Sequence, residues 1–401
     1  NVRGYAVDLS ALGSAAKLME LPVRIHKLLL SASRKTPAWL RAVLALAALA
    51  LCIRVTYVRS ALAAPNLIDE RTWVDRSLKP LTAAPEDPTA YYYAVHHPSF
   101  ARIVYRAVLH RMGVYELDRP LVDYELSAEE NYARGAFVPP EIKIPLRLVN
   151  VAFLSAMVLL VYLGCNHFFH NRALAVAGCL PLLFNPSIST FTCPYIGTDS
   201  MLLFWAVAFW FVWVMARNDG FWKILALGVI GGLMVSTKVN AAFVLAAAAV
   251  YYGAKAKGIR RLLWPLLLVV LPLAVFIALN PVYRQGDFAW AVKVARDVVG
   301  TMVYLKEKST SHDWAQFTKV EILRESFPYW LLFLPTLAVF AASRRQSWFA
   351  PTAVWAAGVI VPNVLLIYVP LPRYCAIISA GFLVFFCAAG IHTVLGVIRS
   401  S

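Results

Sequence analysis

The sequence predicts an all-α protein that crosses a membrane many times, and three observations support this fold class. Of the 401 residues, 60% are hydrophobic and only 15% are charged, a balance that water-soluble domains of this size seldom have. The apolar residues fall in blocks of roughly 17–22, about the length that a helix needs to cross the hydrocarbon core of a bilayer. These blocks lack the alternation of a membrane barrel strand, so helices are the predicted spanning unit.

About ten such blocks follow one another along the chain. We predict spans near residues 39–59, 147–166, 172–191, 198–216, 221–236, 239–254, 262–280, 327–343, 348–368 and 374–397. The first span follows a basic stretch without a clear small-residue cleavage site, which favours an anchor helix over a signal peptide. Residues 1–38 alternate basic and apolar positions and are predicted to form a cytoplasmic amphipathic segment on the membrane surface. Residues 39–401 are then one transmembrane domain.

The charges of the loops predict how the spans are oriented. If the first span runs from inside to outside, the predicted inner loops hold most of the loop cations, as the positive-inside rule requires. These cations are Arg172, Arg217, Lys223, Lys255, Lys257, Arg260, Arg261, Arg344 and Arg345. Both chain ends then lie inside, and two long segments, 60–146 and 281–326, lie outside. We expect the functional residues in or beside these outer segments.

The net charge of +16 comes from 38 basic and 22 acidic residues. Because most of the cations lie in short loops between apolar blocks, they are expected to set topology and to contact anionic lipid headgroups. No basic groove interleaved with aromatic residues is present, which argues against nucleic acid as a partner. The six cysteines form no C-x-x-C pair and are interpreted as small buried hydrophobes.

An amphipathic helix is predicted at residues 100–112 of the first outer segment. Its apolar positions recur at helical spacing, and Arg102, Arg106 and Arg111 occupy polar positions. A helix lying in the outer interface and a helix packed on the bundle both fit this pattern.

Five short polar clusters join this helix on the predicted outer face. Asp69-Glu70 follows the first span, where a carboxylate can act as a general base, hold a divalent cation or simply begin a solvated helix. His96-His97-Pro98-Ser99 precedes the predicted helix; adjacent histidines rarely form a metal site alone, and the proline fits a helix start. The other three clusters lie where later spans meet the outer face.

Asp199 begins a predicted span, where it can bind a substrate or cap the helix. Lys238, in the turn Ser236-Thr237-Lys238-Val239-Asn240, must reach the interface, pair with an acid or bind an anion. Pro372-Arg373-Tyr374 opens the last span with the same alternatives. Because these separated clusters map to one membrane face, they predict a single site equipped to activate a hydroxyl beside a lipid-linked phosphate.

At these residues the sequence resembles the GT-C membrane glycosyltransferases, in particular the protein-O-mannosyltransferase and aminoarabinose-transferase branch (glycosyltransferase family 39). The elements shared with that family, in its order, are Asp69-Glu70, His97-Pro98, Asp199-Ser200, the turn 236–240 and Pro372-Arg373-Tyr374. One departure is Ser99, where relatives often have a second proline. The resemblance implies a GT-C-like bundle of about ten transmembrane helices, with interfacial helices in the outer loop.

The resemblance also implies an inverting transfer of a sugar from a polyprenyl-phosphate donor to a hydroxyl on a protein, lipid or glycan acceptor. Asp69 and Glu70 would be the catalytic pair, with Asp69 deprotonating the acceptor while Lys238 and Arg373 stabilise the departing phosphate. The expected substrate-binding residues are His96, His97, Asp199, Lys238, Asn240, Arg373 and Tyr374. Some relatives use a divalent cation and others do not, so the resemblance leaves the metal open.

Two other classes of function compete with this prediction. A chain with this fold can serve as a non-catalytic structural subunit of a larger membrane complex, in which case the site would be blocked by neighbouring side chains or by a partner. A transporter would place charged residues near mid-membrane in two related halves, whereas the charges here gather at one interface. The expected location is the bacterial inner membrane, with the site facing the periplasm or exterior.

Overall fold

The computed structural model describes residues 37–65, 68–82, 99–123, 126–216, 219–297 and 348–366. Throughout these ranges the regular secondary structure is helical. The chain divides into two compact units, Asn1–Leu51 and Cys52–Ser401. Within the first unit the described residues are those of helix α2 (Ala38–Ile53), which ends just inside the second. The predicted amphipathic segment at 1–38 lies almost wholly outside the described residues and stays a prediction.

Eight of the ten predicted spans coincide with helices. Three helical stretches are long and apolar enough to cross a membrane, and these are Ala38–Ala63, Pro140–Phe168 and Arg260–Leu279. The first of them joins α2, a π-helical turn η1 (Arg54–Val58) and α3 (Arg59–Ala63). The predicted spans at 327–343 and 374–397 lie outside the described residues.

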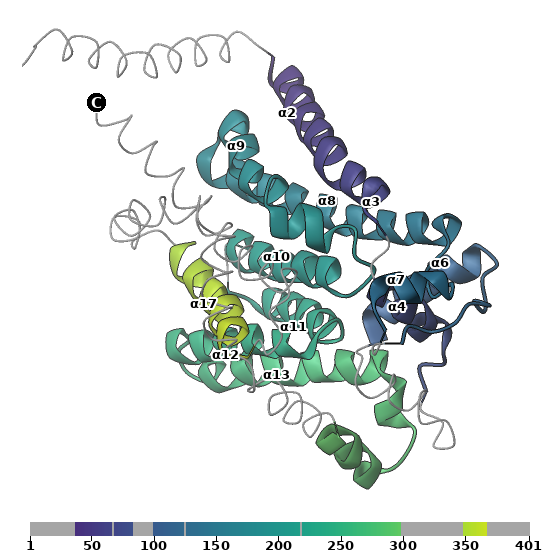
Figure 1. Ribbon diagram of the computed structural model, residues 1–401. Helices are drawn as coiled ribbons and strands as arrows, with labels where there is room; N and C mark the ends of the chain where they lie inside the picture. The colour runs from purple at the N-terminus through teal and green to yellow at the C-terminus, as the bar shows by residue number, and fades with distance from the viewer. Residues whose placement is uncertain are drawn as a thin grey trace, which may run out of the picture. The chain divides into compact units, whose positions relative to one another are not determined.

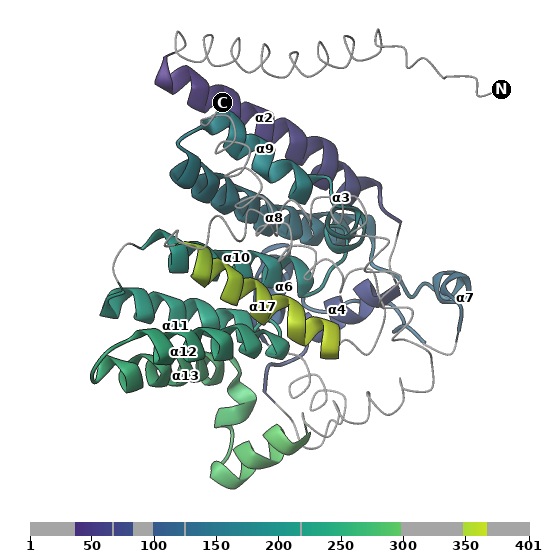
Figure 2. The same cartoon turned by 90° about the vertical axis from the view of Figure 1, so that its left-hand side faces the viewer.

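The seven described spans that follow the first one form a row of packed helices in the second unit. They are α8 (Pro140–Phe169), α9 (Arg172–Leu183) with the π-turn η2 (Ser187–Thr192), α10 (Asp199–Met215), α11 (Phe221–Val235), η3 (Val239–Ala241) with α12 (Ala242–Lys255), α13 (Arg260–Leu279) and α17 (Phe349–Leu366). Neighbouring helices pack in the order α9, α8, α10, α11, α13, and α12 packs against α13 and α17 (Figure 1). A second view shows α11, α12 and α13 stacked together (Figure 2).

Small residues allow the closest of these contacts, between α11 and α13. A Cβ atom added at Gly228 would lie 2.7 Å from the Cβ of Leu271, and one added at Gly232 would collide with Val275. Because lipid tails are as apolar as leucine, membrane helices associate largely through such close packing rather than through the hydrophobic effect. The two glycines therefore set the register of α11 on α13.

Two short helices cover the side of the row on which α8 and α10 begin. They are α4 (Ile68–Leu78) and α6 (Ser99–Arg111), which pack on each other, and α6 also packs on α8. Both lie close to the first turns of α8 and α10 (Figure 1). A third helix, α7 (Ala128–Ala133), starts with a capping box in which Ser127 and Glu130 exchange hydrogen bonds.

Helix α6 begins at Ser99, as the proline before it predicted, but its most buried face is not the predicted apolar one. The fully buried residues are Ser99, Ala101, Arg102, Tyr105 and Leu109, whereas the apolar Phe100, Val104 and Val108 are half-buried against the same core. Arg102, expected at a polar position, donates hydrogen bonds to the backbone oxygens of Arg76, Lys79 and Pro80. Arg76 lies in the last turn of α4 and the other two residues follow it, so a buried guanidinium satisfies backbone oxygens at the end of this helix. Of the two alternatives, the helix packed on the bundle is the one observed.

Candidate functional site

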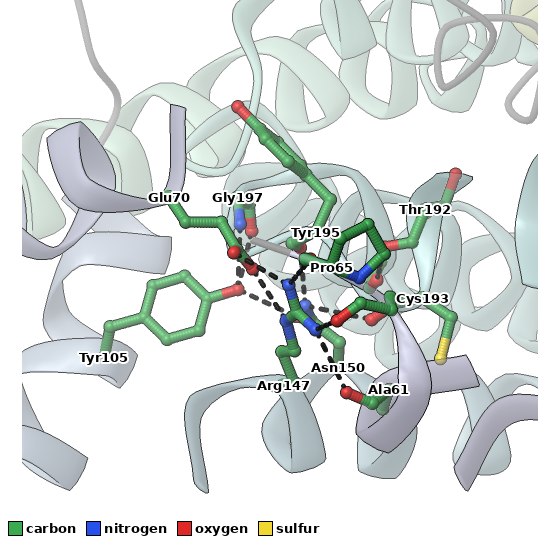
Figure 3. A network of polar contacts seen from close by, with 12 residues as sticks. Ala61, Pro65, Glu70, Tyr105, Arg147, Asn150, Thr192, Cys193, Tyr195 and Gly197 are labelled. Carbon is green, nitrogen blue, oxygen red and sulfur yellow. Dashed lines mark hydrogen bonds and ion pairs between the residues drawn. The ribbon is translucent and has the colours of Figure 1, made fainter. Parts of the chain in front are cut away.

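A buried ion pair joins the acidic motif after the first span to α8. The Nε and Nη2 atoms of Arg147 lie 2.8 Å from the two carboxylate oxygens of Glu70, and both side chains are only 1% exposed. The same guanidinium donates to the backbone oxygens of Ala61, Ala64 and Pro65 (Figure 3). All five of its N–H groups therefore have acceptors. The pair fixes the end of the first span, the start of α4 and α8 against one another.

This pairing changes the interpretation of the acidic motif. Glu70 was predicted as a member of a catalytic pair, or as part of a solvated helix start, yet its carboxylate is buried and engaged by Arg147. The solvated helix start is therefore wrong for Glu70, while its catalytic role stays a prediction. Asp69 lies one residue earlier in α4; the structure describes its backbone there but not its side chain. The role of Asp69 as the general base stays a prediction.

The buried hydroxyl of Tyr105 connects α6 to α8 and to the loop before α10. It lies 2.7 Å from Asn150 Oδ1 and 2.8 Å from the oxygen of Gly197, and it accepts the N–H of Gly197 at 3.1 Å (Figure 3). Burial raises the pKa of Tyr105, and the nearby charges of Asp199 and Glu70 raise it further. The hydroxyl therefore stays protonated at neutral pH and acts as a structural donor rather than as an acid or base.

The loop of residues 193–198 is held from both sides, which positions the start of α10. Asn150 donates to the backbone oxygen of Tyr195 at 2.6 Å, and Trp73 of α4 donates to the Tyr195 hydroxyl at 2.9 Å. A side chain at Gly197 would collide with the ring of Tyr195, so the loop requires glycine there. Asp199 follows directly, as the first residue of α10.

Asp199 and Lys238 form the second ion pair of the site. Lys238 Nζ lies 2.9 Å from Asp199 Oδ1; the Asp199 side chain is 3% exposed and that of Lys238 23%. Asp199 was offered as a helix cap, but the N-cap residue of α10 is Thr198. Of the three alternatives for Lys238, which were to reach the interface, to pair with an acid or to bind an anion, the structure shows the pairing with an acid. These two residues, 39 positions apart, were both predicted for the site.

Three polar residues form what we call the Asn280 junction: Ser99, Ser236 and Asn280. The N–H of Ser99 donates to Asn280 Oδ1 at 2.9 Å, and the N–H of Phe100 donates to the oxygen of Ser236 at 3.0 Å. The first residues of α6 therefore contact the turn that carries Lys238. Because His97 and Pro98 immediately precede Ser99, the histidine motif is tied through the backbone to the lysine turn.

The predicted outer-face clusters are thus brought together as far as the structure describes them. Asn240 is half-buried in η3, two residues after Lys238. His96, His97, Arg373 and Tyr374 lie outside the described residues. Among the residues whose placement is described, no group of three or more potential metal ligands occurs. Both histidines lie outside these residues, so the structure does not test the binding of a divalent cation.

Three supporting residues were missed by sequence reasoning: Tyr105, Arg147 and Asn280. A signal for Arg147 was present, because an arginine at the outer edge of a predicted span needs an acid or backbone oxygens as partners. Asn280 likewise ends a predicted span. Nothing in the sequence near Tyr105 distinguishes its hydroxyl from that of an ordinary interfacial tyrosine.

Comparison with known proteins supports the predicted resemblance. Residues 142–281 match the family model described as dolichyl-phosphate-mannose-protein mannosyltransferase. This range contains Arg147, Asn150, Asp199, Lys238 and Asn280. Among curated proteins, no sequence matches the chain significantly.

Solved structures of ArnT from Cupriavidus metallidurans share the fold. The structure bound to undecaprenyl phosphate has a TM-score of 0.56 and 13% sequence identity, covering 91% of this chain and 64% of that one. The apo structure has a TM-score of 0.51 and 13% identity, covering 87% of this chain and 59% of that one. The chain thus spans less than two thirds of the length of the ArnT chains that it resembles. It is an integral membrane protein with the GT-C-like helical fold that its sequence predicted.

Proposed function

We propose that this protein is an inverting glycosyltransferase that moves a sugar from a polyprenyl-phosphate donor to a hydroxyl acceptor at the outer face of the membrane. The observation that carries the proposal is the pairing of Lys238 with Asp199 beside α4 and α6. Motifs far apart in sequence meet there through buried hydrogen bonds. The family match over residues 142–281 and the ArnT-like fold agree with it.

In this proposal the lysine stabilises the leaving group. As the bond between the anomeric carbon and the phosphate oxygen breaks, negative charge grows on the lipid phosphate, and a cation already in place lowers the energy of that transition state. An ammonium has three N–H groups, so Lys238 can contact both a carboxylate and a phosphate. Asp199 orients the ammonium, and Arg373 would supply a second cation from the last predicted span.

The other half of the reaction is assigned to the acidic motif. Asp69 would take the proton from the acceptor hydroxyl, which attacks the anomeric carbon from the face opposite the phosphate and inverts its configuration. Glu70, bound by Arg147, holds the helix that carries Asp69. His96, His97, Asn240 and Tyr374 are proposed to contact the substrates. The bacterial inner membrane is the proposed location, with the site facing outward.

Transfer by the reconstituted protein tests the proposal. The parent is supplied with undecaprenyl-phosphate sugars and hydroxyl acceptors, and product is measured by mass spectrometry. We expect Asp69→Asn to slow transfer by about a hundredfold or more, the usual loss when a general base is removed. Lys238→Met should weaken binding of undecaprenyl phosphate, whereas Asp219→Asn, beyond the other end of α10, should behave as the parent.

The outcomes separate the proposal from its competitor. Transfer that Asp69→Asn leaves unchanged would overturn the assigned base. If the parent binds undecaprenyl phosphate through Lys238 but transfers no sugar to protein, lipid or glycan acceptors, the chain is a non-catalytic subunit with the same fold.

A further inference from the structure

We propose that Asn280 is a positioning residue that holds the Lys238 turn against the start of α6, so that the phosphate-binding lysine keeps its place. The inference rests on the proposed function, because it assigns Lys238 to the donor phosphate. It adds a residue from the end of α13 that belongs to none of the polar clusters noted in the sequence.

The side chain of Asn280 bridges three elements inside a dry junction. Its Oδ1 accepts the N–H of Ser99 at 2.9 Å, and its Nδ2 donates to the oxygen of Phe276 at 2.7 Å and lies 3.5 Å from Ser236 Oγ. Asn280 is 1% exposed, and Ser99 and Ser236 are fully buried. Buried polar groups without water depend on such partners, so loss of the amide leaves the N–H of Ser99 unsatisfied.

The junction is connected to Lys238 through a short, stiff piece of backbone. The N–H groups of Thr237 and Lys238 both donate to the oxygen of Met234, at 3.1 and 3.0 Å, which closes the turn after α11. Ser236, two residues before Lys238, accepts the N–H of Phe100 at 3.0 Å. A shift of Ser236 relative to α6 therefore also moves Lys238 relative to α6.

The start of α6 is not left open for an anion. The first N–H groups of a helix have no intrahelical acceptor and often bind phosphate. Here the first two are taken by Asn280 and Ser236. The donor phosphate must then be neutralised by side chains, and the accuracy with which Lys238 is placed matters correspondingly more.

The inference can be tested by removing one hydrogen-bond donor, the backbone N–H of Ser99. A proline at this position has no N–H and cannot donate to Asn280, although its fixed backbone angle suits the first residue of a helix. Ser99→Pro therefore removes one hydrogen bond of the junction and keeps a helix start, but it also introduces the second proline that relatives often have here, so Asn280→Leu is the deciding variant. Ser99→Ala is the matched control, because it keeps the N–H and removes a hydroxyl oxygen that has no hydrogen-bond partner within the described ranges.

The experiment measures undecaprenyl phosphate binding to the full chain in nanodiscs, together with the melting temperature. We expect Asn280→Leu and Ser99→Pro each to weaken binding about tenfold, the effect of one lost buried hydrogen bond, while Ser99→Ala binds as the parent. The double variant Ser99→Pro/Asn280→Leu should bind no more weakly than Asn280→Leu, because the two changes remove the same bond. In a Lys238→Met background, Asn280→Leu should have no further effect.

If Asn280 has a purely structural role, Asn280→Leu and Ser99→Pro should lower the melting temperature but leave the affinity of the folded protein at the parent value. That result in both variants overturns the inference. If Lys238→Met weakens binding while Asn280→Leu and Ser99→Pro do not, only this inference fails. If the parent binds no undecaprenyl phosphate, the proposed function fails and the inference falls with it.

Discussion

Two charged clusters lie at opposite ends of the helical row, and they are built differently. At the end where α8 begins, Glu70 and Arg147 are both 1% exposed and pair through two parallel hydrogen bonds. At the other end, after α10, Asp219 contacts Lys223 at 2.9 Å, Lys255 at 3.3 Å and the hydroxyl of Tyr252 at 3.2 Å. There the side chains of Asp219 and Lys255 are 27% and 54% exposed.

The difference teaches that burial, rather than the number of ion pairs, decides what each cluster contributes. Water can replace a lost partner in the Asp219 cluster, where salt also screens the charges. Around Arg147 it cannot, so truncation of this arginine removes two hydrogen bonds from a buried carboxylate and one from each of three backbone oxygens. The Glu70–Arg147 pair should therefore be stiff and intolerant of change, and the Asp219 cluster tolerant.

The largest expected effect is that of Arg147→Ala. Breaking a buried pair by removing one partner costs about 3–5 kcal/mol, and we expect the unfolding free energy in detergent to fall by that amount. The double variant Glu70→Gln/Arg147→Met removes both charges and should recover part of the loss. Equal stability of Arg147→Ala and the parent would show that water reaches Glu70 and would remove the contrast with Asp219.

A smaller effect is expected from Tyr105→Phe, which deletes the hydroxyl shared by α6, α8 and the loop before α10. Leaving Asn150 and Gly197 with unsatisfied buried groups should cost about 1–3 kcal/mol. The thermal unfolding midpoint measures this loss. Tyr115→Phe is the control, because Tyr115 is 67% exposed and its hydroxyl can bond to water. Equal shifts in the two variants would contradict the assigned network.

The smallest effect is expected from Asp219→Asn, at about 1 kcal/mol or less, decreasing with added salt. Burial alone would raise the pKa of Asp219, but the hydrogen bonds and charges of Lys223 and Lys255 outweigh it and lower the pKa. The stabilisation is therefore present above the pKa of an unfolded aspartate, about 3.9, and is lost as the pH falls below it through the lowered folded pKa.

Thermal midpoints measured between pH 6 and pH 3 test this assignment. The parent and Asp219→Asn should differ at pH 6 and converge in the acid range. A difference that persists at pH 3 would mean that packing, and not the charge of Asp219, stabilises this end.

Much of the fold was predictable from the sequence because membrane helices are specified locally. A block of about 20 apolar residues must form a helix in lipid, since no other conformation satisfies its backbone within one segment. Eight predicted spans are helices for this reason, and the match of Pro98-Ser99 to the start of α6 is equally local. Lys238 and Asp199 were also predicted for one site, because loop charges assigned both to one membrane face.

The partners of these residues were not predictable, because pairing between distant positions depends on how the helices pack. Glu70 and Arg147 are 77 residues apart, and no spacing rule connects them. The sequence by itself determined a helical membrane protein with its polar motifs at one face. Only the tertiary structure decided that Glu70 pairs with Arg147 in a buried site, that Arg102 binds backbone oxygens at the end of α4, and that Asn280 joins α6 to the lysine turn. Each of these outcomes depends on which buried groups remain without water and therefore need one another.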